Sequence, residues 1–372
     1  MRLPKSQVKK GSLFMKNRKR IRELGIKIGK YPTGPNNSIT DVPGVKVGHK
    51  TVISDGDSEN GPARTGVTVI LPNEDIFNDR IFANGYVING AGEMTGMIQM
   101  NEWGIIETPI ALTNSMNVGI VADGIIEYMT TRYPSLGDSE DVVIPIVAEC
   151  DDSFLNNPRG RHVKQHHVLS AIANATDGEV EEGSVGSGTG MSCFEFKGGI
   201  GTSSRVIFKQ YTIGTLVMTN LGRREDFLLD GTAVGKGIQD NMPSSSVPEG
   251  SIIIVIGTDA PLLPHQLSRI AKRSALALGK IGSKAHNGSG EIALAFSTGN
   301  ILKRGEESEV QNLHVINEQL LNDVFEATIE SVEEAILNAM FKATTLSGRK
   351  GNTLYEIPIE KAIQILKANK SV

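Results

Sequence analysis

The stretch that decides the fold is Pro248-Glu249-Gly250-Ser251, which runs directly into Ile252-Ile253-Ile254-Val255-Ile256. A continuous run of β-branched apolar residues behind turn residues predicts a buried strand. Glycine and serine are also common in ordinary turns, so the Gly250–Ser251 pair by itself indicates only a turn that enters this strand. The meaning of the serine depends on what the rest of the chain places beside it.

Length and composition describe an ordinary globular protein. The chain has 372 residues, of which 39% are hydrophobic and 22% charged, enough for one large domain or two modest ones with a sizeable core. The net charge of −4 gives no indication of a nucleic-acid partner. Residues 1–23 are rich in Lys and Arg and are expected to form a basic flexible tail, followed by a single domain over 24–372.

Cysteine usage and hydropathy bear on the compartment. Cys150 and Cys193 cannot form a disulfide framework and are expected to be buried free thiols. No apolar run approaches the ~20 residues that a membrane helix needs, so we expect no membrane partner. The short apolar cluster in the basic tail is too small for a secretory signal. A cytoplasmic location is therefore expected.

Strands and helices are mixed along the whole chain. Apolar runs predict strands over 66–72, 142–147, 211–219, 252–256 and 291–296, and a short strand after the turn at 39–49. Helical spacing of apolar residues predicts helices over 118–129, 162–175, 267–278 and 320–340. The glycine-rich segment 85–96 is expected to be a loop. This order predicts an α/β or α+β protein built in layers.

Several motifs fail as ligand sites. The glycine-rich segments 183–190 and 231–237 lack the spacing of phosphate-binding loops, so close-packed loops explain them better. His162 and His166 are four apart on an expected helix, with His167 beside them, but no HExxH pattern accompanies them. An exposed helix face is the better explanation, and no metal or other cofactor is expected. The GxSxG elbow of α/β-hydrolases is absent from the sequence.

Four other polar residues stand at expected strand ends. Ser289 and Glu291 are two apart and would project to one face of a strand, where a hydroxyl and a carboxylate can relay a proton; a polar turn is the alternative. Asn220 ends a strand and could donate its amide to an oxyanion. Glu149 ends a buried strand, where a carboxylate needs a partner, either a substrate ammonium or a structural Arg or Lys. One pocket could collect all four.

With these residues in place, the chain resembles the L-aminopeptidase D-Ala-esterase/amidase (DmpA) family, which includes the β-peptidyl aminopeptidases. The resemblance runs from about residue 24 to beyond 350. The matching segments are ITDVPGVKVGH (39–49), NGAGEMTG (89–96), VAEC-D (147–151), GSGTGMSCFEFKGGIGTSSR (186–205), TNLG (219–222), PEGSIIIVIGTDAPL (248–262), NGSGEIALAFSTGN (287–300) and SGRKGN (347–352).

The resemblance implies a four-layer αββα sandwich of the α+β class that cuts itself between Gly250 and Ser251. It implies a serine aminopeptidase/amidase that acts on N-terminal aminoacyl amides, esters or short peptides, with no metal, and that assembles as a homo-oligomer, commonly a tetramer. Its site residues map onto Ser251 as nucleophile, Ser289 and Glu291 as its support, Asn220 as oxyanion donor and Glu149 beside the substrate's amino group. Asp151 stands where family members often carry an aromatic residue.

Two other classes compete with this interpretation. The chain could be an unprocessed, non-catalytic relative that only binds an amine-bearing small molecule. It could also resemble the ornithine acetyltransferase-like proteins, which share the fold and also cut themselves but use threonine; a serine at position 251 argues against them.

Overall fold

The computed structural model describes residues 18–56, 60–243, 245–247, 250–306 and 308–370. Its centre is a six-stranded sheet in which the strands, in spatial order, are β4 (Ile105–Ile106), β3 (Asp79–Gly90), β12 (Gly290–Lys303), β11 (Ser251–Thr258), β10 (Tyr211–Asn220) and β9 (Ile200–Ile207). Strands β11 and β12 are parallel, and the other neighbours in this sheet are antiparallel. The expected strand at 252–256 therefore lies in the interior of the sheet.

A second sheet of four strands packs against the first. Its spatial order is β1 (Lys46–Ser54), β2 (Ala63–Leu71), β5 (Ile110–Asn114) and β6 (Ile146–Cys150). The facing sides of the two sheets enclose one apolar core, to which Leu112 and Ala148 contribute from this sheet and Ile253 and Leu294 from the larger one. Strand side chains alternate between faces, so every second residue of these strands enters this inner core.

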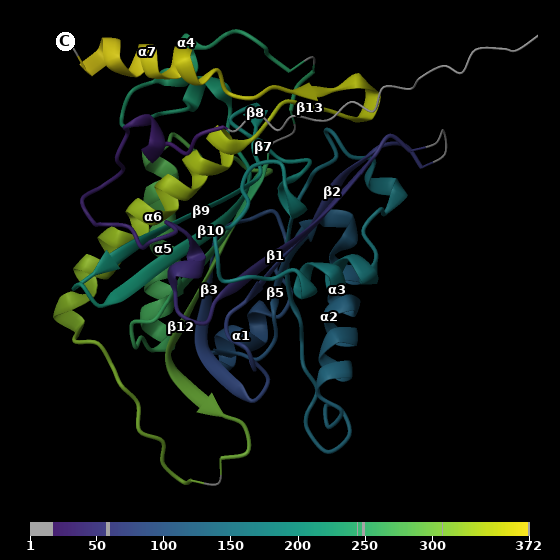
Figure 1. The fold of residues 1–372 in the computed structure, drawn as a ribbon, viewed down its shortest axis with the longest axis vertical. Coiled ribbons are helices and arrows are strands. Elements are labelled where there is room, and N and C mark those ends of the chain that lie inside the picture. The colour runs from purple at the N-terminus through teal and green to yellow at the C-terminus, as the bar shows by residue number, and fades with distance from the viewer. Residues whose placement is uncertain (1–17, 57–59, 244, 248–249, 307, 371–372) are drawn as a thin grey trace, which may run out of the picture.

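Helices cover the outer face of each sheet (Figure 1). α2 (Val118–Arg132) and α3 (Gln165–Ala173) pack on the four-stranded sheet, and α5 (Pro264–Lys280) and α6 (Leu321–Lys342) pack on the six-stranded sheet. α6 and β9 lie so close together that a Cβ on Gly201 would be only 2.0 Å from the Ala335 carbonyl oxygen. The absence of a side chain at Gly201 allows this contact. The layer order is helix, sheet, sheet, helix, which confirms the expected αββα sandwich.

The remaining elements are short or peripheral. They are α1 (Met97–Trp103), α4 (Val234–Gly237), α7 (Ile359–Lys370), the two-residue strands β7 (Ser192–Cys193), β8 (Phe196–Lys197), β13 (Leu346–Ser347) and β14 (Thr353–Leu354). None of the helices in the described part of the chain has the length and hydropathy needed to cross a membrane.

Three sequence-based expectations are wrong in part. The strand expected over 142–147 begins only at Ile146, and Val142 and Ile144 are 65% and 51% exposed, because pairing with β5 starts at Ile146 and Pro145 has no N–H to donate. The loop expected over 85–96 begins as strand, since β3 pairs with β12 as far as Gly90. The helix expected over 162–175 covers only Gln165–Ala173 and excludes His162.

The N-terminal segment joins the packed structure before residue 24. Of the expected tail, residues 1–17 lie outside the described residues, whereas Ile21 is fully buried and Arg22 pairs with Glu334 at 2.6 Å. The same glutamate accepts a hydrogen bond at 2.7 Å from Arg205, which is fully buried on β9 and also pairs with Glu330 at 3.1 Å. This ionic cluster ties the N-terminal segment, β9 and α6 together.

Replacing Arg205 with Ala should lower the free energy of unfolding by about 3–5 kcal/mol, because two buried glutamates lose their shared cation. Lys30→Ala is the matched control, since its ion pair with Glu326 is exposed at the surface and solvent screens it, so the loss in stability should be much smaller. Urea denaturation of both variants measures the difference. Equal losses in the two variants would show that the buried cluster does not stabilise the fold.

Candidate active site

The ends of three neighbouring strands meet at Ser251. Asn220, the last residue of β10, is paired with Ser251, the first residue of β11, and Ile252 is paired with Glu291 on β12. Antiparallel pairing brings the end of β10 to the start of β11, and parallel pairing brings the start of β12 there as well. The residues predicted from the sequence therefore come together where these three interior strands begin or end; they are Asn220, Ser251, Ser289 and Glu291.

Glycine is required at position 250 because a side chain has no room there. A Cβ at this position would lie 1.6 Å from the carbonyl oxygen of Asn220 and 3.2 Å from its side-chain nitrogen. The absence of a side chain lets the Gly250 backbone lie against Asn220.

The side-chain amide of Asn220 is held in one orientation. Its Oδ1 accepts hydrogen bonds from the backbone N–H and the hydroxyl of Ser192, both at 3.0 Å. Its Nδ2 donates to the backbone carbonyl of Asp151 at 2.8 Å. An amide nitrogen carries two protons, so a second N–H is left to donate beside Gly250.

The hydroxyl of Ser251 lies on the inner side of its sheet. Ser251 is 7% exposed, and its Oγ accepts a hydrogen bond from the backbone N–H of Gly290 at 3.1 Å. By strand alternation it shares the inter-sheet face with Ile253, whereas Glu291 shares the helix-side face with Ala293. The Gly250–Ser251 peptide thus lies between the serine hydroxyl and the Glu291 carboxylate.

Ser289 and Glu291 form the expected pair. The Ser289 hydroxyl lies 2.5 Å from Oε1 of Glu291 and 3.0 Å from the carbonyl oxygen of His286, so its single proton can serve only one of them at a time. Oε2 of Glu291 is buried and has no hydrogen-bond partner among the described residues. Burial raises the pKa of the Glu291 carboxyl, and the hydrogen bond from Ser289 opposes that rise.

Glu149 lies on the other side of Gly290. A Cβ on Gly92 would be 3.3 Å from Oε1 of Glu149 and 3.5 Å from Cα of Gly290, so Gly92 separates the carboxylate from the residue that contacts Ser251. Glu149 accepts hydrogen bonds from the Ser115 hydroxyl and from the backbone N–H of Glu93. Burial raises the pKa of the Glu149 carboxyl, and these two hydrogen bonds oppose that rise.

No Arg or Lys pairs with Glu149 in the described ranges, although the residue is only 7% exposed. The structural cation that the sequence left open as its partner is therefore absent from that part of the chain. Asp151, at the position where family members often carry an aromatic residue, is exposed and turns its carboxylate towards Ser153. Only its backbone carbonyl reaches the site, through Asn220.

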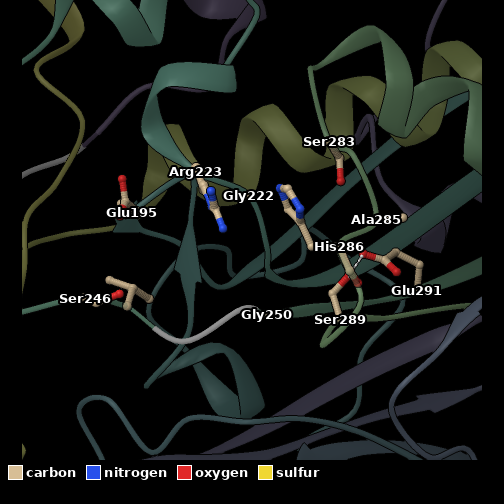
Figure 2. A pocket seen from close by; sticks show the side chains of 11 residues that line it. Glu195, Gly222, Arg223, Ser246, Gly250, Ser283, Ala285, His286, Ser289 and Glu291 are labelled. Carbon is tan, nitrogen blue, oxygen red and sulfur yellow. Dashed lines mark hydrogen bonds between the residues drawn. The ribbon is translucent and has the colours of Figure 1, made fainter.

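A cavity of about 260 Å³ opens beside Gly250 (Figure 2). Ser289 and Glu291 line it, together with residues that the sequence analysis did not single out, chiefly Arg223 and His286. Arg223 directly follows the TNLG segment and His286 directly precedes NGSGE, so both adjoin segments that the sequence analysis did select. Ser251, Asn220 and Glu149 are not among the residues that line this cavity.

The rejected motifs are accounted for by packing. A Cβ on Gly188 would lie 2.4 Å from the backbone nitrogen of Ile200, so the glycines of 183–190 belong to a close-packed loop. His162 precedes α3, and the rings of His166 and His167 stack edge to face with centroids 4.1 Å apart. No group of three or more His, Cys, Asp or Glu side chains suited to a metal ion occurs within the described ranges.

Comparison with known proteins places this architecture among the N-terminal-nucleophile hydrolases. The chain is 37% identical to L-aminopeptidase D-Ala-esterase/amidase from Ochrobactrum anthropi, a prototype of the serine aminopeptidases with a variant of that fold; the TM-score is 0.89, over 94% of this chain and 99% of the other. A β-aminopeptidase structure from Burkholderia sp. is 38% identical, with a TM-score of 0.87 over the same shares.

Sequence comparison gives the family. The chain is 40% identical over 369 residues to the β-peptidyl aminopeptidase BapA of Sphingosinicella microcystinivorans, which covers 94% of this chain and 92% of that protein. The pattern of peptidase family S58 matches residues 37–354. The chain belongs to peptidase family S58, and it is an aminopeptidase/amidase of the N-terminal-nucleophile fold.

Proposed function

We propose that this peptidase cuts its own Gly250–Ser251 bond and then uses Ser251 to hydrolyse N-terminal aminoacyl amides, esters or short peptides. The proposal rests on the groups that surround this peptide bond. The Gly250–Ser251 bond lies between the Ser251 hydroxyl and the Ser289–Glu291 pair, and the oriented Asn220 amide lies beside Gly250. These are the groups that acyl transfer to a serine requires.

Self-cleavage would proceed as an acyl shift. Ser251 Oγ attacks the Gly250 carbonyl carbon, the C–N bond breaks, and the acyl group passes from nitrogen to oxygen as an ester. The Ser251 hydroxyl proton goes to the departing nitrogen, which becomes a free α-amine. Water then hydrolyses the ester and leaves a carboxylate on Gly250. The remaining N–H of Asn220, beside Gly250, would stabilise the oxyanion of each step.

The matured enzyme would use the same groups on its substrate. A free α-amine has a reference pKa of about 8, so it can act as a base near neutral pH. The unpaired Oε2 of Glu291 is an acceptor available to this amine. Ser251 would attack the substrate carbonyl, with its own amine, Ser289 and Glu291 transferring the proton to the leaving group.

Glu149 would bind the substrate's ammonium group. Its carboxylate is buried without a cationic partner in the described part of the chain, which favours a cation supplied by the substrate. Such a contact explains a requirement for a free N-terminus, and the names of the relatives, β-peptidyl aminopeptidase and L-aminopeptidase, support it.

We further propose a cytoplasmic homo-oligomer, with a tetramer as the expected state, built from the single domain that follows the basic tail. Exposed apolar side chains support an assembly surface: Ile98 on α1 is 90% exposed and Trp103 is 51% exposed. A contact between subunits would bury both of them.

The alternative is an unprocessed, non-catalytic protein that binds an amine-bearing molecule at Glu149. Hydrolysis of aminoacyl p-nitroanilides, tested with several L-α-, D- and β-aminoacyl groups, separates the two proposals. Release of p-nitroaniline by the purified protein supports the peptidase, and binding without release supports the alternative.

The purified wild-type chain should run as two fragments on a denaturing gel, and Ser251→Ala should run as one full-length band because the attacking oxygen is gone. Mass spectrometry should place the new N-terminus at Ser251. Ser246→Ala is the control, since Ser246 also lines the cavity but carries no proposed role in the cut. A wild type that stays whole under all conditions contradicts self-cleavage.

Gly250→Ala should stop or strongly slow the cut even though Ser251 is intact, because the new methyl group would overlap the Asn220 carbonyl oxygen and push the bond out of line. A time course of fragment formation measures the effect. As a control, Gly279→Ala introduces the same methyl group at a place with nothing within 4 Å and should be cut like the wild type.

Glu149→Gln should lower kcat/KM for aminoacyl substrates about 10- to 100-fold, the size expected for a hydrogen bond between charged groups. Because the pKa of Glu149 is raised, wild-type kcat/KM should begin to fall with decreasing pH above the ordinary pKa of a glutamate; the variant should lack that dependence. Glu127→Gln, an exposed residue of α2, is the control. An unchanged preference for free over N-acetylated substrates in Glu149→Gln would rule out the contact.

A further inference from the structure

Lys197 on β8 is fully buried, and its ammonium group is bonded to the protein backbone. Nζ donates hydrogen bonds to the carbonyl oxygens of Met191 and Gly198, both at 2.7 Å, and of Gly188 at 3.1 Å. Burial lowers the pKa of Lys197 to about 7. The three acceptors favour the charged form, because an ammonium has three protons to donate and a neutral amine only two. The ammonium therefore ties the glycine-rich segment 186–191 to β8.

One of these acceptors belongs to the peptide unit that contacts Asn220. Lys197 Nζ donates to the carbonyl oxygen of Met191, and the N–H of the same peptide bond, that of Ser192, donates to Oδ1 of Asn220 at 3.0 Å. A trans peptide unit is planar, so fixing its C=O also fixes the direction of its N–H. Hydrogen bonds that are joined in a chain also polarise one another. The ammonium therefore both aims and strengthens the Ser192 N–H as a donor to Asn220.

The hairpin of β7 and β8 keeps Lys197 and Ser192 together. The two residues are paired directly across the hairpin, and its turn is formed by Phe194 and Glu195. Both turn residues have positive φ angles, 51° and 60°, which two-residue hairpin turns require but which these side chains rarely adopt. The Phe194 N–H donates to the carbonyl oxygen of Leu221 at 2.6 Å. The strained turn is thus held by the residue that directly follows β10.

The orientation of the Asn220 amide decides whether it can stabilise an oxyanion. With Oδ1 held by the backbone N–H and the hydroxyl of Ser192, Nδ2 faces the Asp151 carbonyl and Gly250. In the flipped orientation Oδ1 would face that carbonyl and the developing oxyanion, and both contacts would be repulsive. Ser192 therefore selects the orientation in which the amide can act.

We propose that Lys197 is a positioning residue for the oxyanion donor: it holds the 191–192 peptide, which together with the Ser192 hydroxyl keeps the Asn220 amide turned towards the reacting carbonyl. This inference rests on the proposed function and adds two residues that act through Asn220. An oxyanion forms only during the reaction, so losing this support should lower the rate of self-cleavage and kcat and should leave KM unchanged.

The first test is Ser192→Ala, which removes one of the two hydrogen bonds on Oδ1 of Asn220 and keeps the other. Removing an oxyanion donor outright slows acyl transfer about 10²- to 10³-fold, so loosening one should slow it about tenfold. A time course of fragment formation measures self-cleavage, and hydrolysis of an aminoacyl p-nitroanilide by the matured enzyme gives kcat and KM. Both rates should fall, with KM as in the wild type.

Ser187→Ala is the matched control. Ser187 is buried in the same glycine-rich segment, and its hydroxyl donates at 3.0 Å to Thr68 instead of Asn220. Each substitution removes one buried hydroxyl hydrogen bond, and urea denaturation measures the stability that each one loses. Ser187→Ala should be cut and should turn over like the wild type. Equal rates for Ser187→Ala and Ser192→Ala would overturn the inference.

Lys197→Met tests the ammonium itself, because it keeps much of the length of the side chain and removes the charge. It should slow self-cleavage and lower kcat at least as much as Ser192→Ala, with KM unchanged. Where Lys197→Met does not fold, Lys197→Gln takes its place, since its amide can still donate to two of the three carbonyl groups. Wild-type rates in the folded variant would overturn the role of Lys197.

A double-mutant cycle separates positioning from general support of the fold. If Ser192 acts through Asn220, adding Ser192→Ala to Asn220→Ala should slow self-cleavage no further. The same tenfold slowing in both backgrounds would contradict the inference. Where Asn220→Ala is not cut at all, the comparison of Ser192→Ala with Ser187→Ala decides. A wild type that is neither cut nor active overturns the proposed function instead.

Discussion

The arrangement around Ser251 depends on one constraint, the pairing of β10 with β11 up to its last residue pair. Because Asn220 stands opposite Ser251, the residue before the serine must pass against the Asn220 carbonyl, where only glycine has room. The same pairing places the Asn220 amide beside Gly250. The position of the candidate oxyanion donor and the identity of residue 250 thus have one cause, the register of two strands in the middle of a sheet.

Much of the architecture could be predicted because local signals agreed with tertiary packing. The apolar runs of β2, β10 and β11 are buried on both faces, so continuous hydrophobicity identified them. Helices α2 and α5 each bury one face, whereas α6 is buried on all sides from Glu330 to Phe341; all three were found from the spacing of their apolar residues. The failures came where tertiary pairing outweighed composition, as at Gly85–Gly90 in β3, which pairs with β12 despite its glycines.

The sequence identified which residues gather at the candidate site better than it predicted how they are arranged. Spacing alone correctly placed Ser289 next to Glu291. It could not reveal that the Ser251 hydroxyl and the Glu291 carboxylate lie on opposite faces of the sheet, because that depends on the alternation of two separate strands. Nor could it select Arg223 and His286, which have no regular spacing and meet only because two loops converge at the cavity.

The central sheet also interleaves the two parts of the chain on either side of residue 250. β12 and β11, from the C-terminal part, lie between β3 and β10, from the N-terminal part, and α6 covers β9. A cut at Gly250 therefore converts one chain into two that complete each other's sheet, much like a split protein. Separating them would require unfolding both, and reassembly from the unfolded state would become a bimolecular reaction whose rate depends on concentration. The cleaved state would thus be permanent in practice, because the protein folds as one chain and the two fragments stay associated after the cut.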